Sequence, residues 1–207
     1  SKTQQTCLQI TRALAVYTKQ STMLKNKIHG EQTLGHPSKA VTASLKRSLK
    51  HLTNEKERLE KELETLVKAE HQELLTRLKT IPGMGIKTAL ALVVMTDGFN
   101  RFQSAKELCS YCGLTPIIKQ SGTSVNGRSR ISKMGNQKLR NLLFMCSFNA
   151  CKSNKACREL YERIVAKGKS KKLALIAVCN KLLKQAFAIA KSGLVYDETY
   201  KSTLVKN

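Results

Sequence analysis

Apolar residues recur at helical spacing in the first part of the chain. Between residues 5 and 28 they follow one another at intervals typical of one helix face, and the segment holds neither proline nor glycine. We therefore expect a helix there. The next segment, GEQTLGHPSK at residues 30–39, contains two glycines and Pro37, which should end the helix. The apolar positions of this predicted helix are Leu8, Leu14, Tyr17, Leu24 and Ile28.

A second helix should begin near Ser38 or Thr42, and it carries leucines in a heptad pattern. Lys56 interrupts the pattern at a core position, and the run EKERLEKELE supplies the charged flanks of a coiled coil. An isolated pair of such helices needs a partner to bury its leucine seam. The sequence leaves open whether the two helices fold back on each other or pair with another chain. The seam consists of Leu45, Leu49, Leu52, Leu59, Leu63 and Leu66.

The pattern changes at residue 80, in the segment TIPGMGIKTALALVV. Gly83 and Gly85 lie between one predicted helix, HQELLTRLK, and another that should start near Ile86 and run to about Thr96. This arrangement resembles a helix-hairpin-helix element, in which glycines let the backbone approach a phosphate that the next helix meets with its N-terminal amides. Lys87 would add a cation at the same end. An ordinary tight turn in a helical domain is the alternative interpretation.

Three further helices are expected after this turn. SAKELCSYC opens with Ser104 as N-cap and Glu107 three residues later, which is the spacing of a capping box. NQKLRNLLFMCSFNACK and KKLALIAVCNKLLKQAFAIAKSG have broad apolar faces and should form the core. The fold class predicted is therefore mainly α: a two-helix coiled-coil arm on residues 1–80, followed by a compact helical domain on residues 81–207. A basic Ser-Gly loop within that domain is a candidate for a short hairpin.

Charge narrows the class of partner. The chain has 37 Lys plus Arg against 14 Asp plus Glu, a net charge of +23 over 207 residues. This excess is far more than solubility requires, and nucleic acid is the obvious counter-charge. Two basic regions, residues 1–54 and 98–207, flank a nearly neutral segment. A membrane partner is not expected, because no segment approaches 18 uninterrupted apolar residues and aromatic residues make up only 5%.

Cysteine usage points to a reducing compartment. Seven cysteines in scattered positions do not make a disulfide framework. Cys109 and Cys112 form a lone CxxC, which we interpret as two small buried residues on a helix ending at Gly113, and no metal site is expected. The chain begins at Ser1 without a methionine or signal peptide, so we expect a fragment of a cytoplasmic or nucleoid-associated protein.

The segment from Gly113 to Arg140 is the strongest candidate for chemistry. It contains a Ser-Gly turn and no acidic side chain. A nucleophilic hydroxyl beside fixed cations is what attack on a phosphodiester needs, because charge develops on the non-bridging oxygens. A basic surface loop without chemistry is the alternative, since Ser-Gly is a common turn dipeptide. The cations that accompany the turn include Arg128, Arg130, Lys133, Lys138 and Arg140.

Several motifs in order resemble a known family. IPGMG and a helix, then F-x-S-A-KEL-x-x-Y-x-GL-x-P, then QSG, then RISK-x-GN-x-x-LR-x-x-L, are similar to the C-terminal transposase domain of bacterial insertion-sequence recombinases related to the Piv and MooV DNA invertases. These elements recombine DNA under the guidance of a bridge RNA. The resemblance covers about residues 75–195. It implies a preceding coiled coil and an N-terminal RuvC-like domain with four acidic residues and magnesium.

The resemblance assigns roles to individual residues. Ser121 of QSG would attack the phosphodiester and hold the broken strand as a phosphoserine, and Gly122 would permit the turn that exposes its hydroxyl. Asn136 would cap the helix that follows Gly135 and offer amides to a phosphate. Ser124, Ser129 and Ser132 are rival hydroxyls in the same loop. The residues implied to hold phosphates or stabilise the transition state are Arg128, Arg130, Lys133 and Arg140.

The chain departs from the family in its acidic residues. It has only two aspartates, Asp97 and Asp197, and seven of its twelve glutamates lie between residues 55 and 73. No acidic magnesium centre is expected here, and Ser121 has no evident general base in this sequence. We therefore expect no cofactor in this fragment and Mg²⁺ in the missing N-terminal domain.

The predicted function is DNA transposition or site-specific recombination by a serine nucleophile, with this chain as half of a composite active site. Its expected partners are DNA, a guide (bridge) RNA and further copies of itself in a dimer or tetramer. The alternative is a non-catalytic DNA- or RNA-binding module that uses the hairpin and the basic loops. A plain dimerisation scaffold is a third interpretation, which the net charge disfavours.

Overall fold

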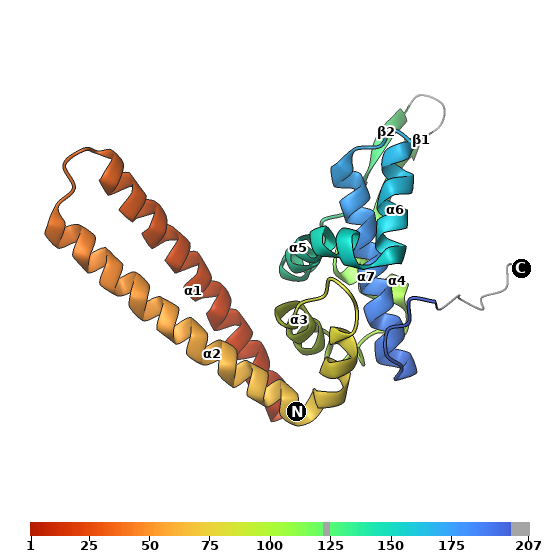
Figure 1. The fold of residues 1–207 in the computed structure, drawn as a ribbon, viewed down its shortest axis with the longest axis horizontal. Coiled ribbons are helices and arrows are strands. Elements are labelled where there is room, and N and C mark those ends of the chain that lie inside the picture. The colour runs from red at the N-terminus through yellow and green to blue at the C-terminus, as the bar shows by residue number, and fades with distance from the viewer. Residues whose placement is uncertain (122–124, 200–207) are drawn as a thin grey trace, which may run out of the picture. The chain divides into compact units, whose positions relative to one another are not determined.

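A computed structural model describes residues 1–121 and 125–199 of the chain, and of residues 118–129 it describes the backbone only where they lie in strands. The chain divides into two compact units, Ser1–Glu70 and His71–Asn207, which are described separately. Both consist mainly of α-helices (Figure 1). The mainly α fold class predicted from the sequence is confirmed.

The first unit is a pair of helices. Helix α1 spans Lys2–Thr33, with the Ser1 hydroxyl accepting a hydrogen bond from the backbone N–H of Gln4 as its N-cap, and α2 spans Lys39–Lys79. The connection that joins them contains Pro37 and Gly35, whose φ of 80° favours glycine. Up to Glu70, α2 runs back beside α1, so the structure selects the folded-back hairpin from the two alternatives left open by the sequence (Figure 1).

Burial in the first unit is greatest near the start of α1. Cys7, Ile10 and Leu14 of α1 are buried, as are Leu63 and Val67 of α2. The leucine seam of α2 lies on the inner side of the hairpin, because every one of its members is buried or half-buried. The repeat of leucines therefore serves this intramolecular pairing, as expected for an apolar seam that must leave water.

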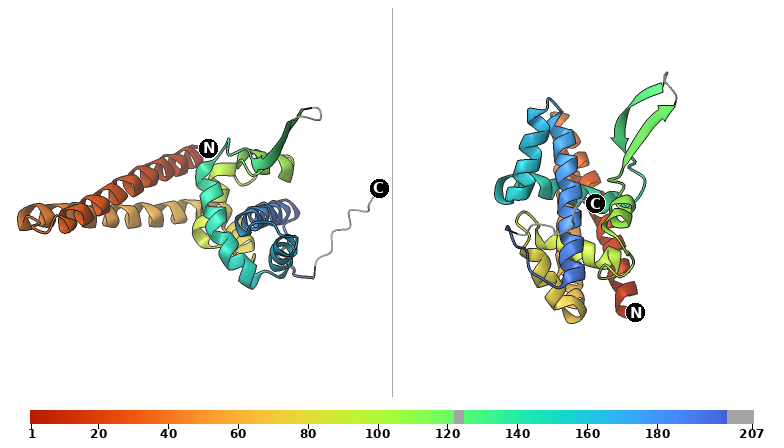
Figure 2. Two further views of the ribbon diagram at one scale, coloured as in Figure 1. Left: turned by 90° about the horizontal axis from the view of Figure 1, so that it is seen from above. Right: turned by 90° about the vertical axis from the view of Figure 1, so that its right-hand side faces the viewer.

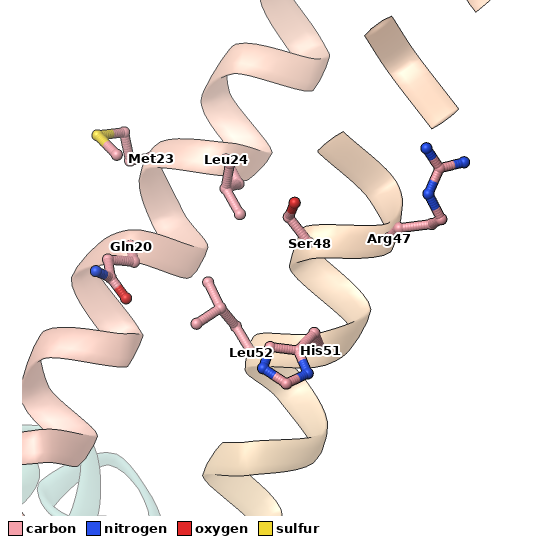
Figure 3. A pocket seen from close by; sticks show the side chains of 7 residues that line it. All are labelled: Gln20, Met23, Leu24, Arg47, Ser48, His51 and Leu52. Carbon is pink, nitrogen blue, oxygen red and sulfur yellow. The ribbon is translucent and has the colours of Figure 1, made fainter. Parts of the chain in front are cut away.

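The two helices leave an open pocket of about 570 Å³ in the first unit. Figure 3 shows Leu24 of α1 and Leu52 of α2 facing each other across it. Gln20, Arg47 and His51 stand at its rim, and no acidic residue lines it. Because its floor is apolar and its polar groups do not converge, the pocket has none of the features of a catalytic site.

Helix α2 is kinked at His71, which has a non-helical φ of −134° and ψ of 31°. The boundary between the two units falls at this kink, whereas the sequence pattern places it at residue 80. The last turns of α2 belong to the second unit, where Leu74, Leu75 and Leu78 are buried. The apolar periodicity of α2 continues through the boundary at His71. The sequence therefore shows a boundary only at the next glycine-rich turn, near residue 80.

The second unit is built around its last helix. Helix α7 packs against α4, α5 and α6, and α3 packs against α5 (Figure 1). Val178, Leu182, Leu183 and Ala186 of α7 are fully buried. The helices of this unit, besides the end of α2, are α3 (Ile86–Thr96), α4 (Ala105–Tyr111), α5 (Gln137–Ser153), α6 (Lys155–Ala166) and α7 (Lys171–Ser192).

In the described part of the chain, α7 is the one helix long and apolar enough to cross a membrane by length and composition. Seven of its apolar residues between Ala174 and Ile189 are buried in the centre of the second unit. The core helix of a globular domain passes the same test of length and composition, and its burial here accounts for the apolar sequence.

A two-stranded antiparallel sheet interrupts the helices. Strand β1 (Pro116–Ser121) pairs with β2 (Val125–Ile131), with an irregularity in register between Ile117 and Lys119. The short hairpin expected from the Ser-Gly loop is thus present. Figure 2 shows the two strands extending away from the helices of the second unit. We call β1 and β2 together the Ser-Gly hairpin.

The segment after α7 folds back over the start of the second unit. Arg77 donates from Nη1 to the carbonyl oxygen of Gly193 at 3.2 Å, and the backbone N–H of Tyr196 donates to Oγ1 of Thr80 at 2.8 Å. The Tyr196 hydroxyl lies 3.2 Å from Oδ1 of Asn154, a fully buried residue that caps α6. These contacts fasten the end of α2 and the start of the glycine turn, at Thr80, to the segment that follows α7.

Candidate nucleic-acid interface and the Ser-Gly hairpin

Ser121 is the last residue of β1, and its backbone pairs with Val125 at the end of the hairpin remote from the helices. Gly122 and Ser124, which the sequence analysis also singled out, lie outside the described residues. Arg128 and Ser129 belong to β2, and their side chains, like that of Ser121, are outside the description. The structure therefore locates the candidate nucleophile on its strand and leaves its chemistry to experiment.

The base of the hairpin is fixed by backbone hydrogen bonds. The N–H of Ser132 donates to the carbonyl oxygen of Thr115 at 3.0 Å, and that of Lys133 to Gly113 at 3.2 Å. The N–H of Asn136 donates to the carbonyl oxygen of Tyr111 at 2.7 Å. We call residues 132–136 the exit loop, because the chain leaves the hairpin through it. Three bonds to the segment 111–115 hold the exit loop against the end of α4.

Two glycines allow this close packing. Gly135 has a φ of 123°, and a Cβ there would lie 2.2 Å from the carbonyl oxygen of Tyr111. Gly113 has a φ of 67°, and a Cβ there would lie 2.5 Å from the carbonyl oxygen of Met134. Both distances are far shorter than van der Waals contact, so neither position accepts a side chain without movement of the backbone. Gly113 of the GL motif and Gly135 of the GN motif therefore both permit the close packing of the exit loop against the segment 111–115.

Asn136 joins three helices at this junction. Its Oδ1 accepts a hydrogen bond from the N–H of Leu139 at 3.0 Å, so the predicted capping of α5 is confirmed. Its Nδ2 lies 3.2 Å from the hydroxyl of Tyr111 in α4 and 3.0 Å from the sulfur of Met95 in α3. Contact between Asn136 and a phosphate remains a prediction.

The cations predicted to bind phosphate divide into two kinds. Arg140 is half-buried and donates from Nη1 to the carbonyl oxygen of Cys112 at 2.8 Å, so it caps the end of α4 from within the unit. Arg130 and Lys133 are exposed near the base of the hairpin. Lys133 has a φ of 56°, which is unusual for a residue with a side chain. Exposed cations such as Arg130 and Lys133 suit phosphate binding better than Arg140, whose guanidinium already donates a hydrogen bond within the unit.

Arg101 belongs to the same junction, although sequence reasoning missed it. Its guanidinium lies 5.6 Å from the centre of the Tyr111 ring and 6.0 Å from that of Phe102, and Nη1 donates to the carbonyl oxygen of Met95 at 3.2 Å. The signal available in the sequence was the aromatic pair formed by Phe102, just before the predicted helix SAKELCSYC, and Tyr111, near the end of that helix. Arginine stacks on aromatic faces of this kind.

The glycine turn between α2 and α3 contains one structural glycine and one exposed glycine. Gly83 has a φ of 91°, and a Cβ there would lie 2.6 Å from the Cα of Ala150 in α5. Gly85 is the N-cap of α3, is exposed, and has nothing within 4 Å of its Cβ position. Lys87 is exposed on the first turn of α3. The turn thus offers Gly85 and the start of α3 to solvent, while Gly83 is used for packing.

The thiols of the CxxC pair are buried, as the sequence analysis expected. Cys109 lies on α4, and Cys112 ends that helix just before Gly113. Burial, with a smaller contribution from the neighbouring Cys109, raises the pKa of Cys112 to about 12. Among the described residues there is no group of three or more His, Cys, Asp or Glu side chains placed to hold a metal ion. The magnesium that the family resemblance implies therefore does not fit the residues described here.

The fold is a helical domain from which a β-hairpin of basic sequence extends, and comparison with known proteins identifies its class. Residues 75–162 match the family described as "Transposase IS116/IS110/IS902 family". The chain therefore carries a transposase domain of this family. All residues discussed above from Gly83 to Arg140 lie within the matched segment.

Individual relatives agree with this assignment. The chain is 32% identical over 157 residues to "Insertion element IS110 uncharacterized 43.6 kDa protein" of Streptomyces coelicolor, covering 76% of this chain and 38% of that protein. It is 39% identical over 125 residues to the "Pilin gene-inverting protein" of Moraxella lacunata, covering 58% of this chain and 38% of that one. A "Transposase for insertion sequence element IS1111A" of Coxiella burnetii is 28% identical over 145 residues. The chain spans 38% of the length of each of these relatives.

Proposed function

We propose that this chain is the serine-bearing part of a DNA transposase or site-specific recombinase. The support is the family match together with the printed names of its relatives, which include transposases and a gene-inverting protein. The structural observation that carries the proposal is the position of Ser121 at the outer end of a β-hairpin whose base is fixed between α4 and α5. A fixed base and a projecting end suit a nucleophile that must reach a phosphate on a large substrate.

In the proposed step, Oγ of Ser121 attacks the phosphorus of a DNA phosphodiester. A bond forms between Oγ and phosphorus, the bond from phosphorus to one sugar oxygen breaks, and that oxygen leaves with a proton. The serine proton passes to a base. Negative charge grows on the non-bridging oxygens during this exchange, and the exposed cations Arg130 and Lys133, with Arg128 of β2, would stabilise it.

The base and the metal chemistry would come from outside this chain. We propose an acidic Mg²⁺-binding domain as the second half of a composite site, and because no residue set described here fits that ion, we assign it no ligand in this chain. The further partners we propose are a guide RNA and additional copies of the chain, acting at the nucleoid in the bacterial cytoplasm. The net charge of +23 suits a protein that holds both DNA and RNA.

The alternative is a nucleic-acid-binding module without chemistry. It is favoured by the same exposed cations, Arg130 and Lys133, since phosphate binding needs no nucleophile.

Ser121→Ala in a protein that joins this chain to an acidic domain separates the two functions. We expect recombination to be lost while DNA binding is retained. Ser132→Ala is the matched control, because Ser132 is a rival hydroxyl whose own bond goes to the carbonyl oxygen of Met134. Recombination that survives Ser121→Ala would favour the binding module.

A further inference from the structure

Met134 is an exposed apolar side chain in the exit loop. It is 76% exposed, the highest value among the large apolar residues that the structure describes as exposed. Exposed apolar side chains scattered singly over a surface need no explanation. Met134 differs from these because of the backbone that carries it and the charges around it.

The backbone on both sides of Met134 is fixed. Its carbonyl oxygen lies against Gly113, and the bonds from Ser132, Lys133 and Asn136 to the segment 111–115 enclose it on both sides. A long side chain on a mobile loop usually folds onto the nearest apolar surface, as the hydrophobic effect favours. The exit loop instead holds the Met134 side chain in water.

The conformation of the exit loop is unfavourable in isolation. Lys133 adopts a φ of 56° and Gly135 a φ of 123°, so Met134 lies between two residues on the left-handed side of the Ramachandran plot. A non-glycine residue held there costs on the order of 1 kcal/mol or more and persists only when surrounding contacts impose it. The contacts of the exit loop thus hold Lys133 in a strained backbone conformation and keep the next side chain, Met134, exposed.

The sequence on either side of Met134 is cationic. Arg130 and Lys133 are exposed close to it in the chain, and no acidic residue occurs from Gly113 to Arg140. A protein partner would need a far larger apolar area than one methionine provides, since stable protein interfaces bury about 800 Å² on each partner. DNA needs only one apolar side chain, inserted between base pairs, with cations on the adjoining phosphates.

We infer that Met134 is a wedge that inserts into a base step of the DNA bound by the Ser-Gly hairpin. This inference rests on the proposed DNA function. It adds that the duplex is unstacked at the base step that Met134 enters. Arg130 and Lys133 would hold the phosphates next to the opened step. Unstacking at that step bends the duplex and exposes its backbone near the hairpin that carries Ser121.

The test uses duplexes that contain flexible TA and CA steps, with the fluorescent base 2-aminopurine beside one of them in each duplex. We expect fluorescence to rise when the chain binds, because the analogue brightens as it unstacks. Met134→Ala should abolish that rise and weaken binding about tenfold, the loss of one buried methionine side chain. Met134→Leu, which keeps the apolar volume, should restore both.

Met145→Ala is the matched control. Met145 is also a methionine, 65% exposed, but it lies on α5 outside the exit loop. It should behave as the wild type. Thermal unfolding of Met134→Ala should be unchanged, because the side chain packs against little in the structure.

Each contrary outcome overturns a distinct claim. Binding that raises no fluorescence in the wild type, or a rise that survives Met134→Ala, refutes the wedge and leaves the proposed DNA function standing. If Met134→Ala changes the mass of the protein measured by sedimentation and leaves the fluorescence rise unaffected, Met134 contacts another copy of the chain and not DNA. Absence of binding to any duplex by the wild type refutes the DNA function itself.

Discussion

Gly83 lies so close to Ala150 that a Cβ on the glycine would be 2.6 Å from both the Cα and the backbone nitrogen of the alanine. The turn before α3 is therefore pressed directly onto the backbone of α5. The sequence predicted phosphate contact for both glycines of this turn, with an ordinary tight turn as the alternative. The structure gives Gly83 a packing role that is sufficient to explain it, and leaves Gly85 facing solvent.

We predict that Gly83→Ala destabilises the protein by more than about 2 kcal/mol, because it adds a backbone clash to a positive φ. Gly85→Ala should cost less than about 1 kcal/mol, since its φ of −82° is ordinary and its Cβ meets nothing. Urea unfolding of the two variants measures the difference. Equal losses of stability would contradict the packing role of Gly83.

We predict a graded series at the junction of α3, α4 and α5. Tyr111→Phe removes one hydroxyl, which lies 3.2 Å from Asn136, and should cost about 0.5–1.5 kcal/mol. Asn136→Ala removes the α5 cap as well, so its cost should be larger, about 2–3 kcal/mol. If the two free energies of unfolding were equal, the cap would contribute nothing, and the role given to Asn136 would be wrong.

Local signals in the sequence predicted helix ends well. The capping box at Ser104 is present, since its hydroxyl accepts from the N–H of Glu107 at 3.2 Å and the Glu107 carboxylate accepts from the N–H of Gln103 at 3.0 Å. The helix break at Gly113 and the cap at Asn136 were also predicted. Each of these depends on residues within a few positions of one another, which a single sequence displays directly.

Contacts between distant segments were not predictable in this way. The family resemblance implies that Arg140 holds a phosphate, and this role stays a prediction. Its guanidinium also donates to the carbonyl oxygen of Cys112, a contact that no spacing rule indicates. Helix α6 was missed, although Asn154 caps it and is a helix-start residue. The bond between Tyr196 and Asn154 joins residues far apart in the chain. Such pairings depend on tertiary packing and appear only once the helices are placed.

We predict that the protein loses stability in alkali through its buried thiols. Burial raises the pKa of Cys112, Cys157 and Cys179 to about 12, against an ordinary value of 9.0. The folded protein thus keeps these protons where the unfolded chain releases them. The stabilisation is complete below pH 9.0 and is lost as pH rises toward 12, with each thiol contributing up to about 1.4 kcal/mol per pH unit.

Urea unfolding across that pH window measures the slope. Cys112→Ala should reduce the slope of the unfolding free energy against pH by the contribution of one thiol. Cys151→Ala should change the slope little, because the Cys151 thiol is half-buried and its pKa is raised less. A stability that stays level from pH 9.0 to 12 would contradict the protonated, buried state of these thiols.

We predict that DNA binding weakens steeply with salt, because each phosphate contact releases counterions and contributes about −0.9 to the slope of log K against log salt concentration. Lys133→Ala should reduce that slope by about one contact without changing stability, since Lys133 is exposed. Arg140→Ala should instead lower stability, because it removes the donor to Cys112. A salt-independent affinity would contradict a phosphate-led interface.

The central claim is that Ser121 forms a covalent link to DNA only beside an acidic domain. Incubation with labelled DNA and magnesium, followed by a denaturing gel, measures the link directly. We expect this chain alone to bind DNA without an adduct, and a protein that joins it to the acidic domain to form one that Ser121→Ala abolishes. An adduct formed by the isolated chain, or one that survives Ser121→Ala in the joined protein, would contradict the account.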